Sequence, residues 1–156
     1  MDSDAKILIV DDDENIRKVL NAILEDQGYN IDSAGTAREA IKKAEKNYYN
    51  LALIDIRLPD MEGIELLTRI KDTTPRMRKI IITGYPTLQN AVDAVNKGAD
   101  AYIMKPFDVE GVLGTISEQL RKQEQEKKYT QDKVAEFIET RVRELDFEKE
   151  TAQTKR

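Results

Sequence analysis

The fold is decided by one stretch of sequence, Leu51-Ala52-Leu53-Ile54-Asp55-Ile56-Arg57-Leu58-Pro59. A short apolar run that ends at a charge and a proline predicts a buried parallel strand followed by a loop. Open α/β sheets bind their ligands at the carboxyl ends of their strands, and Asp55 is expected at such an end. We therefore take Asp55 as the centre of a candidate site.

Other short apolar runs occur on both sides of this stretch, at residues 7–10, 30–34, 80–82 and 101–104. Between the runs, apolar residues recur at helical spacing, and Gly28 and Gly98 follow two of these segments as C-terminal caps. Alternating strands and helices predict a parallel sheet with helices on both faces. Five strands and five helices fit an α/β, flavodoxin-like, doubly wound sheet of strand order 2-1-3-4-5.

The composition changes after the fifth predicted strand. All seven Gly and all four Pro lie at or before Gly114, and the remainder is rich in Glu, Gln, Lys and Arg, which favour helix. We predict a domain over residues 1–122, followed by a helical extension or linker over residues 123–156. The extension is either continuous or broken near residues 128–130.

The composition of the whole chain limits its function. It has 156 residues, a net charge of −5, no Cys and no His, which excludes a disulfide, a thiolate site and a histidine base or ligand. The negative charge argues against nonspecific binding to nucleic acid or a membrane surface. No apolar stretch approaches the roughly 20 residues that span a bilayer, and the acidic N-terminus is unlike a signal peptide. We expect a soluble, cytoplasmic protein.

Three acids, Asp11-Asp12-Asp13, follow the first predicted strand. In the order 2-1-3-4-5 the first and third strands are neighbours, so Asp11, Asp12 and Asp55 are expected to converge. Clustered carboxylates repel one another, and such a cluster persists when a cation compensates the charge. Oxygen ligands suit a hard divalent ion, and Mg²⁺ is the default in cells. Alternatively, Asp12 or Asp13 could cap the helix that begins near Glu14.

Two further polar pairs end predicted strands: Thr83-Gly84 ends the fourth and Lys105-Pro106 ends the fifth. A Thr hydroxyl can donate to a phosphoryl oxygen, Lys supplies a positive charge, and Gly84 lets a backbone N–H approach an anion. Each pair alone is typical of a turn or a solvated cation. Because they share one end of the sheet with Asp55, together they indicate a carboxylate that accepts a phosphoryl group.

The sequence resembles the receiver domain of response regulators in two-component signalling, over roughly residues 4–122. The matching stretches are residues 7–13, 53–63, 82–85 and 98–107. The resemblance implies that Asp55 takes a phosphoryl group from a sensor histidine kinase, and that the chain is not otherwise an enzyme. It implies that Asp12, Asp55 and the Arg57 backbone carbonyl bind Mg²⁺, with Asp11 acting mainly through a bound water.

The resemblance also implies how the phosphoryl group is held. Lys105, Thr83 and the backbone N–H groups of Arg57 and Gly84 would bind its oxygens, and the Lys105–Pro106 peptide would be cis. In-line attack by a carboxylate requires a cation to neutralise the transferring oxygens.

A switch is implied as well. Thr83 moves toward the phosphoryl group, and Tyr102 rotates into the space that Thr83 leaves. The readout surface would be the fourth helix, fifth strand and fifth helix, roughly residues 87–122. Arg57 and Tyr85 occupy the two positions that set the phosphoryl lifetime in this family, and their bulk predicts slow hydrolysis.

The helical extension over residues 123–156 indicates how the chain would act on a downstream target. Residues 123–156 hold nine acids and eight bases and lack the Gly-containing turn of a helix-turn-helix, so we predict output by protein–protein interaction and not by DNA binding. The apolar stripe from Val134 to Leu145 could pair with a second copy, dock on its own domain, or lead to an output module. A homodimer could therefore form through this stripe or through the readout surface. Alternatively, the segment that carries this stripe is a solvated helix that frays.

Three other functions fit less well. A haloacid-dehalogenase-type phosphatase would use Asp11 as nucleophile, with Thr83 and Lys105 as later motifs, but it leaves Asp55 without a role and lacks a later acidic pair. A flavodoxin is disfavoured because three acids after the first strand would repel the phosphate of its flavin. A receiver with a dead site is disfavoured because no signature residue is missing.

Overall fold

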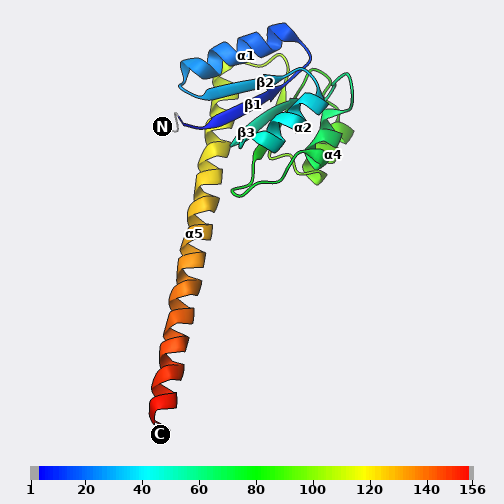
Figure 1. Cartoon of the computed structure of the whole chain (residues 1–156). Helices are drawn as coiled ribbons and strands as arrows, with labels where there is room; N and C mark the ends of the chain where they lie inside the picture. The colour runs from blue at the N-terminus through cyan, green and yellow to red at the C-terminus, as the bar shows by residue number, and fades with distance from the viewer. Residues whose placement is uncertain (1–3, 155–156) are drawn as a thin grey trace. The chain divides into compact units, whose positions relative to one another are not determined.

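The computed structural model describes residues 4–154, and residues 4–123 are built around one parallel sheet (Figure 1). Its strands are β1 (Lys6–Val10), β2 (Asn30–Ala34), β3 (Leu51–Asp55), β4 (Arg78–Thr83) and β5 (Ala101–Met104). The strand order is β2-β1-β3-β4-β5, and every neighbouring pair is parallel. The predicted flavodoxin-like order is therefore confirmed.

Five helices connect and follow the strands. They are α1 (Glu14–Asp26), α2 (Ala37–Lys46), α3 (Gly63–Arg69), α4 (Leu88–Asn96) and α5 (Val109–Thr154). Asp13, Thr36 and Thr87 cap α1, α2 and α4 by accepting backbone N–H groups of the first turn, so the capping role expected of Asp13 is confirmed. Gly28 and Gly98, which follow α1 and α4, have φ of 90° and 101°. Glycine adopts this left-handed conformation readily, and it ends each helix.

The sheet has an apolar core on each face. On β1, Leu8 and Val10 belong to a core with α2, α3 and α4, whereas Ile7 and Ile9 belong to one with α1 and α5. Successive side chains of a strand point to opposite faces, so both faces of this strand are buried. Burial on both faces leaves the strand ends as the place where polar side chains can gather.

The chain divides into two compact units between Gln123 and Glu124. Helix α5 includes residues 128–130, so the alternative of a break there is wrong. In the second unit the large apolar side chains are exposed; they are Tyr129, Val134, Phe137, Ile138, Val142, Leu145 and Phe147. Among residues 4–154, none of the helices combines the length and the apolar character that crossing a bilayer requires.

Candidate functional site

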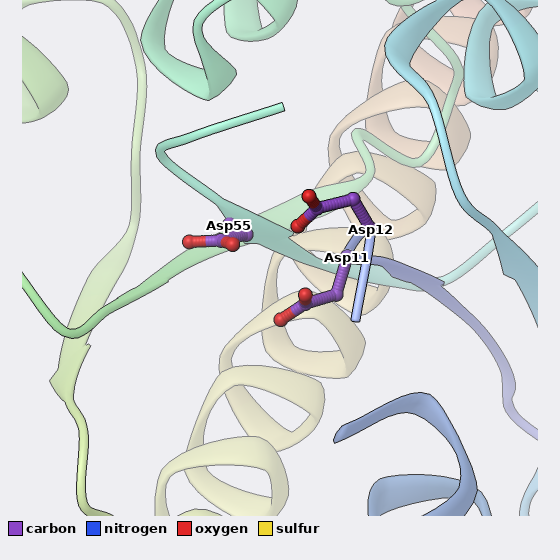
Figure 2. A group of neighbouring side chains, drawn as sticks. All are labelled: Asp11, Asp12 and Asp55. Atoms are coloured by element: carbon purple, nitrogen blue, oxygen red, sulfur yellow. The ribbon is translucent and has the colours of Figure 1, made fainter. Parts of the chain in front are cut away.

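The register of β1 and β3 brings three carboxylates together. Val10 pairs with Ile54, so Asp11 and Asp55 leave neighbouring strands at the same edge of the sheet. Carboxylate oxygens of Asp11, Asp12 and Asp55 all lie within 4.8 Å of one another (Figure 2). Asp11 and Asp55 are buried, and Asp12 is exposed. The predicted convergence of these acids is present, and the cluster could hold a metal ion.

Lys105 connects two of the acids. Its Nζ lies 3.0 Å from Oδ2 of Asp11 and 3.6 Å from Oδ2 of Asp55. Its backbone N–H donates to the Thr83 carbonyl at 2.7 Å, which places it beside the end of β4. The Lys105–Pro106 peptide is cis. Burial lowers the pKa of Lys105, but the hydrogen bond and charge of Asp11 and the charge of Asp55 outweigh it and raise the pKa overall. Lys105 is therefore a cation at neutral pH.

Asp55 lies in an environment that disfavours its charge. Burial raises its pKa most, and the negative charge of Asp11 raises it further. Lys105 and a hydrogen bond from the Arg57 backbone act in the opposite direction but leave the pKa raised. A divalent cation among the three carboxylates would relieve this repulsion. The donors are all oxygens, the ligand set that hard cations such as Mg²⁺ prefer, so the residues present fit such an ion.

Thr83 is the last residue of β4, the strand next to that of Asp55, and Gly84 follows it. Asp55 pairs with Ile82, and Thr83 follows it with its side chain fully buried. The Thr83 hydroxyl accepts a hydrogen bond from the Tyr85 N–H at 3.0 Å. A Cβ built on Gly84 would meet the Lys105 side chain at 3.9 Å, an ordinary contact. Space alone therefore does not require glycine at position 84.

Tyr102 shares a face of the sheet with Thr83. It pairs with Ile81, whose side chain and that of Thr83 point to the same side of β4. The Tyr102 hydroxyl is buried and has no hydrogen-bond partner among the described residues, and burial raises its pKa. Although Tyr102 lies on the edge strand β5, its hydroxyl is therefore shielded from water. In this structure the Thr83 and Tyr102 hydroxyls are not joined by a hydrogen bond.

Arg57 and Tyr85 form a stacked pair next to the site. The Arg57 guanidinium carbon lies 3.7 Å from the centroid of the Tyr85 ring, a close cation–π contact. Arg57 follows Asp55 by two residues and Tyr85 follows Thr83 by two, so the pair joins the loops after β3 and β4. The sequence identified both residues but not their contact.

Three residues near the site were not assigned a role from the sequence. A Cβ on Gly63 would lie 2.0 Å from the Asp55 carbonyl oxygen, so only glycine fits without movement. Arg17 donates to the Asp11 carbonyl at 2.7 Å. Asp60 accepts two backbone N–H groups from the start of α2, both at 2.9 Å. A glycine at the start of a predicted helix was a usable signal for Gly63, whereas Arg17 and Asp60 resemble ordinary surface residues.

Known proteins resemble this chain over the same region. Residues 7–117 match the model of the response regulator receiver domain. The transcriptional regulatory protein ZraR of Escherichia coli K12 is 35% identical over 114 residues, which are 73% of this chain and 26% of that protein. The response regulator ArlR of Staphylococcus saprophyticus is 38% identical over 122 residues, 77% of this chain and 54% of that protein. The chain thus spans between a quarter and about half of the length of these relatives.

Solved structures agree with the sequence matches. A CheY-like response regulator receiver domain protein from Methanospirillum hungatei JF-1 has 50% identity and a TM-score of 0.76, covering 79% of this chain and 98% of its own. The beryllofluoride-activated NtrC4 receiver domain dimer has 39% identity and a TM-score of 0.71, covering 76% of this chain and 98% of its own. With the acids, lysine and threonine at one edge of a 2-1-3-4-5 sheet, these matches lead to one conclusion: the chain belongs to the response regulator receiver domain family.

Proposed function

We propose that Asp55 accepts a phosphoryl group from the phosphohistidine of a sensor histidine kinase, with Mg²⁺ bound beside it. The observation that carries the proposal is the cluster of three carboxylates within 4.8 Å, with Lys105 Nζ 3.6 Å from Asp55. The carboxylates supply a nucleophile and oxygen ligands for a cation, and Lys105 supplies a further positive charge. We place this reaction in the cytoplasm, where such kinases phosphorylate their partners.

The chemistry is a single displacement at phosphorus. A carboxylate oxygen of Asp55 attacks, the P–N bond to the kinase imidazole breaks, and the imidazole leaves with the electron pair and then takes a proton. Asp12, Asp55 and the Arg57 carbonyl would hold Mg²⁺, with Asp11 acting through water, and the ion would supply charge neutralisation at the phosphoryl oxygens. Lys105 and the Thr83 hydroxyl bind other phosphoryl oxygens.

Backbone N–H groups are proposed to bind the remaining phosphoryl oxygens. The hydrogen bond from the Arg57 backbone to Asp55 supports a role for that N–H, and Gly84 supplies another beside Lys105. The chain accepts one phosphoryl group and later loses it by hydrolysis, and it turns over no other substrate. It is thus a self-modifying acceptor and not an enzyme in the ordinary sense.

The added charge then acts on Thr83 and Tyr102. We propose that Thr83 leaves the Tyr85 N–H for a phosphoryl oxygen, and that Tyr102 adjusts to the space this opens. The buried Tyr102 hydroxyl finds no hydrogen-bond partner within residues 4–154, which supports this, because a buried polar group gains by finding a partner. Phosphorylation would shift an existing equilibrium between two conformations.

The output surface proposed for this switch is α4–β5–α5. Its exposed apolar side chains support a protein partner, because a cluster of such residues marks interaction sites. They are Leu88, Val92 and Val95 on α4, Met104 on β5 and Val109 at the start of α5. A second copy is one such partner, and the receiver dimer of NtrC4 is a precedent for it.

The relatives do not support the expectation that the output excludes DNA. ZraR is named a transcriptional regulatory protein, and this chain covers only 26% of it. We therefore restrict the proposal to the immediate output, a protein contact made by the receiver.

Arg57 and Tyr85 are proposed to slow the loss of the phosphoryl group. The Arg57 guanidinium carbon lies 3.7 Å from the centroid of the Tyr85 ring, so the stacked pair joins the loop after Asp55 to the loop after β4 and would hinder an attacking water. In-line hydrolysis needs water on the side of phosphorus opposite the Asp55 oxygen, so a cover over that side lengthens the lifetime.

The proposal is tested by intact mass after incubation with acetyl phosphate. The wild type with Mg²⁺ is expected to gain one phosphoryl group, and the wild type without Mg²⁺ and Asp55→Asn to gain none. Asp13→Asn is the matched control, because Asp13 caps α1 and lies outside the metal cluster, and it is expected to gain one group. A gain that survives in Asp55→Asn would move the nucleophile to Asp11 and favour the phosphatase. No gain in the wild type, even with a kinase as donor, would refute phosphoryl acceptance.

A further inference from the structure

The peptide that joins two metal-site acids is held by an arginine from α1. Arg17 Nη1 donates to the Asp11 carbonyl oxygen at 2.7 Å. That carbonyl belongs to the peptide unit between Asp11 and Asp12, so the hydrogen bond limits rotation of the backbone that carries both carboxylates. Within the same loop, the Asp11 carboxylate also accepts a hydrogen bond from the Asp13 N–H at 2.9 Å. The loop after β1 is thus held at two points.

Arg17 also lies against the turn between β2 and α2. A Cβ built on Gly35 would come within 3.3 Å of Arg17 Nη1, so a larger residue there would press on the guanidinium. The Asp11 N–H donates to the Ala34 carbonyl at 3.1 Å, just before this turn. Arg17 therefore lies between the turn and the loop that presents Asp11 and Asp12.

Asp60 ties the loop after β3 to the same turn. Its two carboxylate oxygens accept the N–H groups of Ala37 and Arg38, each at 2.9 Å. Helix α2 already has its own cap, because the Thr36 hydroxyl accepts the Glu39 N–H at 3.1 Å. The contact of Asp60 is thus an additional bond between two loops. Its own loop carries Arg57, whose carbonyl is a proposed ligand of the ion.

We propose that Arg17 and Asp60 are positioning residues for the divalent cation. Arg17 holds the carbonyl between Asp11 and Asp12 and lies beside the turn at Gly35. Asp60 ties the loop after β3 to the turn formed by residues 35–38. Three carboxylates that repel one another would otherwise drift apart when no ion is bound, and binding would then have to draw them back. This inference rests on the proposed function, because it concerns the affinity of that site for Mg²⁺.

Arg17 allows a test in which charge and position predict opposite results. Removing a positive charge near a cation site should strengthen Mg²⁺ binding by Coulomb's law. Removing a positioning contact should weaken it, by about tenfold for a residue that orients metal ligands. Lys18 is the matched control, since it is the next residue on α1, is exposed, and pairs only with Glu14 at 3.3 Å among the ion pairs described here.

The experiment is calorimetric titration of the full chain with MgCl₂ at high ionic strength, for the wild type, Arg17→Gln and Lys18→Gln. We expect Arg17→Gln to bind Mg²⁺ about tenfold more weakly and Lys18→Gln to bind it as the wild type does. Equal or tighter binding by Arg17→Gln would overturn the inference. A wild type that binds no Mg²⁺ would instead refute the proposed Mg²⁺ site itself, so the two failures are distinguishable.

A second variant covers the case in which Arg17→Gln does not fold. Asp60→Asn keeps one acceptor oxygen but loses the second, and we expect weaker Mg²⁺ binding at an ionic strength that screens the lost charge. Asp100→Asn is its control, because Asp100 pairs with Arg76 before β5, at the other end of the sheet. Asp60→Asn binding Mg²⁺ as tightly as Asp100→Asn does would overturn the inference.

Discussion

Replacing Gly63 with alanine tests how the backbone of Asp55, the proposed phosphoryl acceptor, is supported. Gly63 begins α3 and is buried, and its N–H donates to the Ile56 carbonyl at 2.6 Å. An added Cβ would lie 2.0 Å from the Asp55 carbonyl oxygen and 2.9 Å from both the Asp55 carbonyl carbon and Ile54 Cγ2. The main obstacle is backbone, which cannot rotate away as the end of a long side chain can.

The change in unfolding free energy caused by Gly63→Ala is the sum of two opposing effects. Forcing a methyl group into a packed site costs about 1–3 kcal/mol of unfolding free energy. Replacing glycine by alanine in a helix raises the free energy of unfolding by roughly 0.5–1 kcal/mol. Because the Cβ and the Asp55 oxygen must separate by more than one ångström, the upper part of the first range applies. We expect a net loss of about 2 kcal/mol, or a fall in Tm of about 4–8 °C.

Gly114→Ala is the matched control, because a Cβ there meets nothing within 4 Å. The same substitution is expected to stabilise α5 by about 0.5–1 kcal/mol. Urea unfolding followed by the near-ultraviolet circular dichroism of the tyrosines gives both values. The Asp55 carbonyl belongs to the peptide that follows the proposed acceptor, so Gly63→Ala should also take up phosphoryl groups from acetyl phosphate more slowly. Equal unfolding free energies for the two variants would refute this reasoning.

Further predictions concern a salt bridge, the stacked pair and the buried hydroxyl. Burial raises the pKa of Asp100, but hydrogen bonds from Arg76 and the Lys79 N–H and the nearby positive charges outweigh it and lower the pKa overall. The free energy of folding that the Asp100 carboxylate contributes is therefore fully present above the pKa of the unfolded chain, and it is lost as the pH falls through the lower pKa of the folded chain. In Asp100→Asn, the free energy of unfolding should therefore depend less on pH in the acid range. Arg57→Ala, which removes the stacking on Tyr85, is expected to shorten the phosphoryl lifetime severalfold in a mass-spectrometric decay experiment, and an unchanged lifetime would contradict a covering role. Tyr102→Phe removes a buried hydroxyl that has no hydrogen-bond partner in the described part of the chain. The unphosphorylated variant should therefore be as stable as the wild type, or more stable by about 1 kcal/mol, in urea unfolding.

The sheet and the acid cluster were predictable because both depend on strand ends. Apolar runs located the strands, and the order 2-1-3-4-5 alone brought Asp11 and Asp55 to neighbouring positions. The contact of Lys105 with Asp11 spans 94 residues, yet it follows from the same rule, since β5 ends at the same edge. Parallel strands bring residues that are distant in the chain together by register, and register can be inferred from hydrophobic pattern.

The supports of the site were not predictable, because they depend on how loops fold over the strand ends. Asp60 meets the N–H groups of Ala37 and Arg38 across 23 and 22 residues, and neither loop has a periodic pattern that aligns it with the other. Arg17 lies on a helix where an arginine is ordinarily solvated, and only the position of the Asp11 carbonyl gives it a partner. The acids of the cluster repel one another, so contacts that hold their loops are expected to matter most where no cation is bound. A sequence can therefore reveal the groups of a candidate site while the residues that hold them in place resemble surface charges.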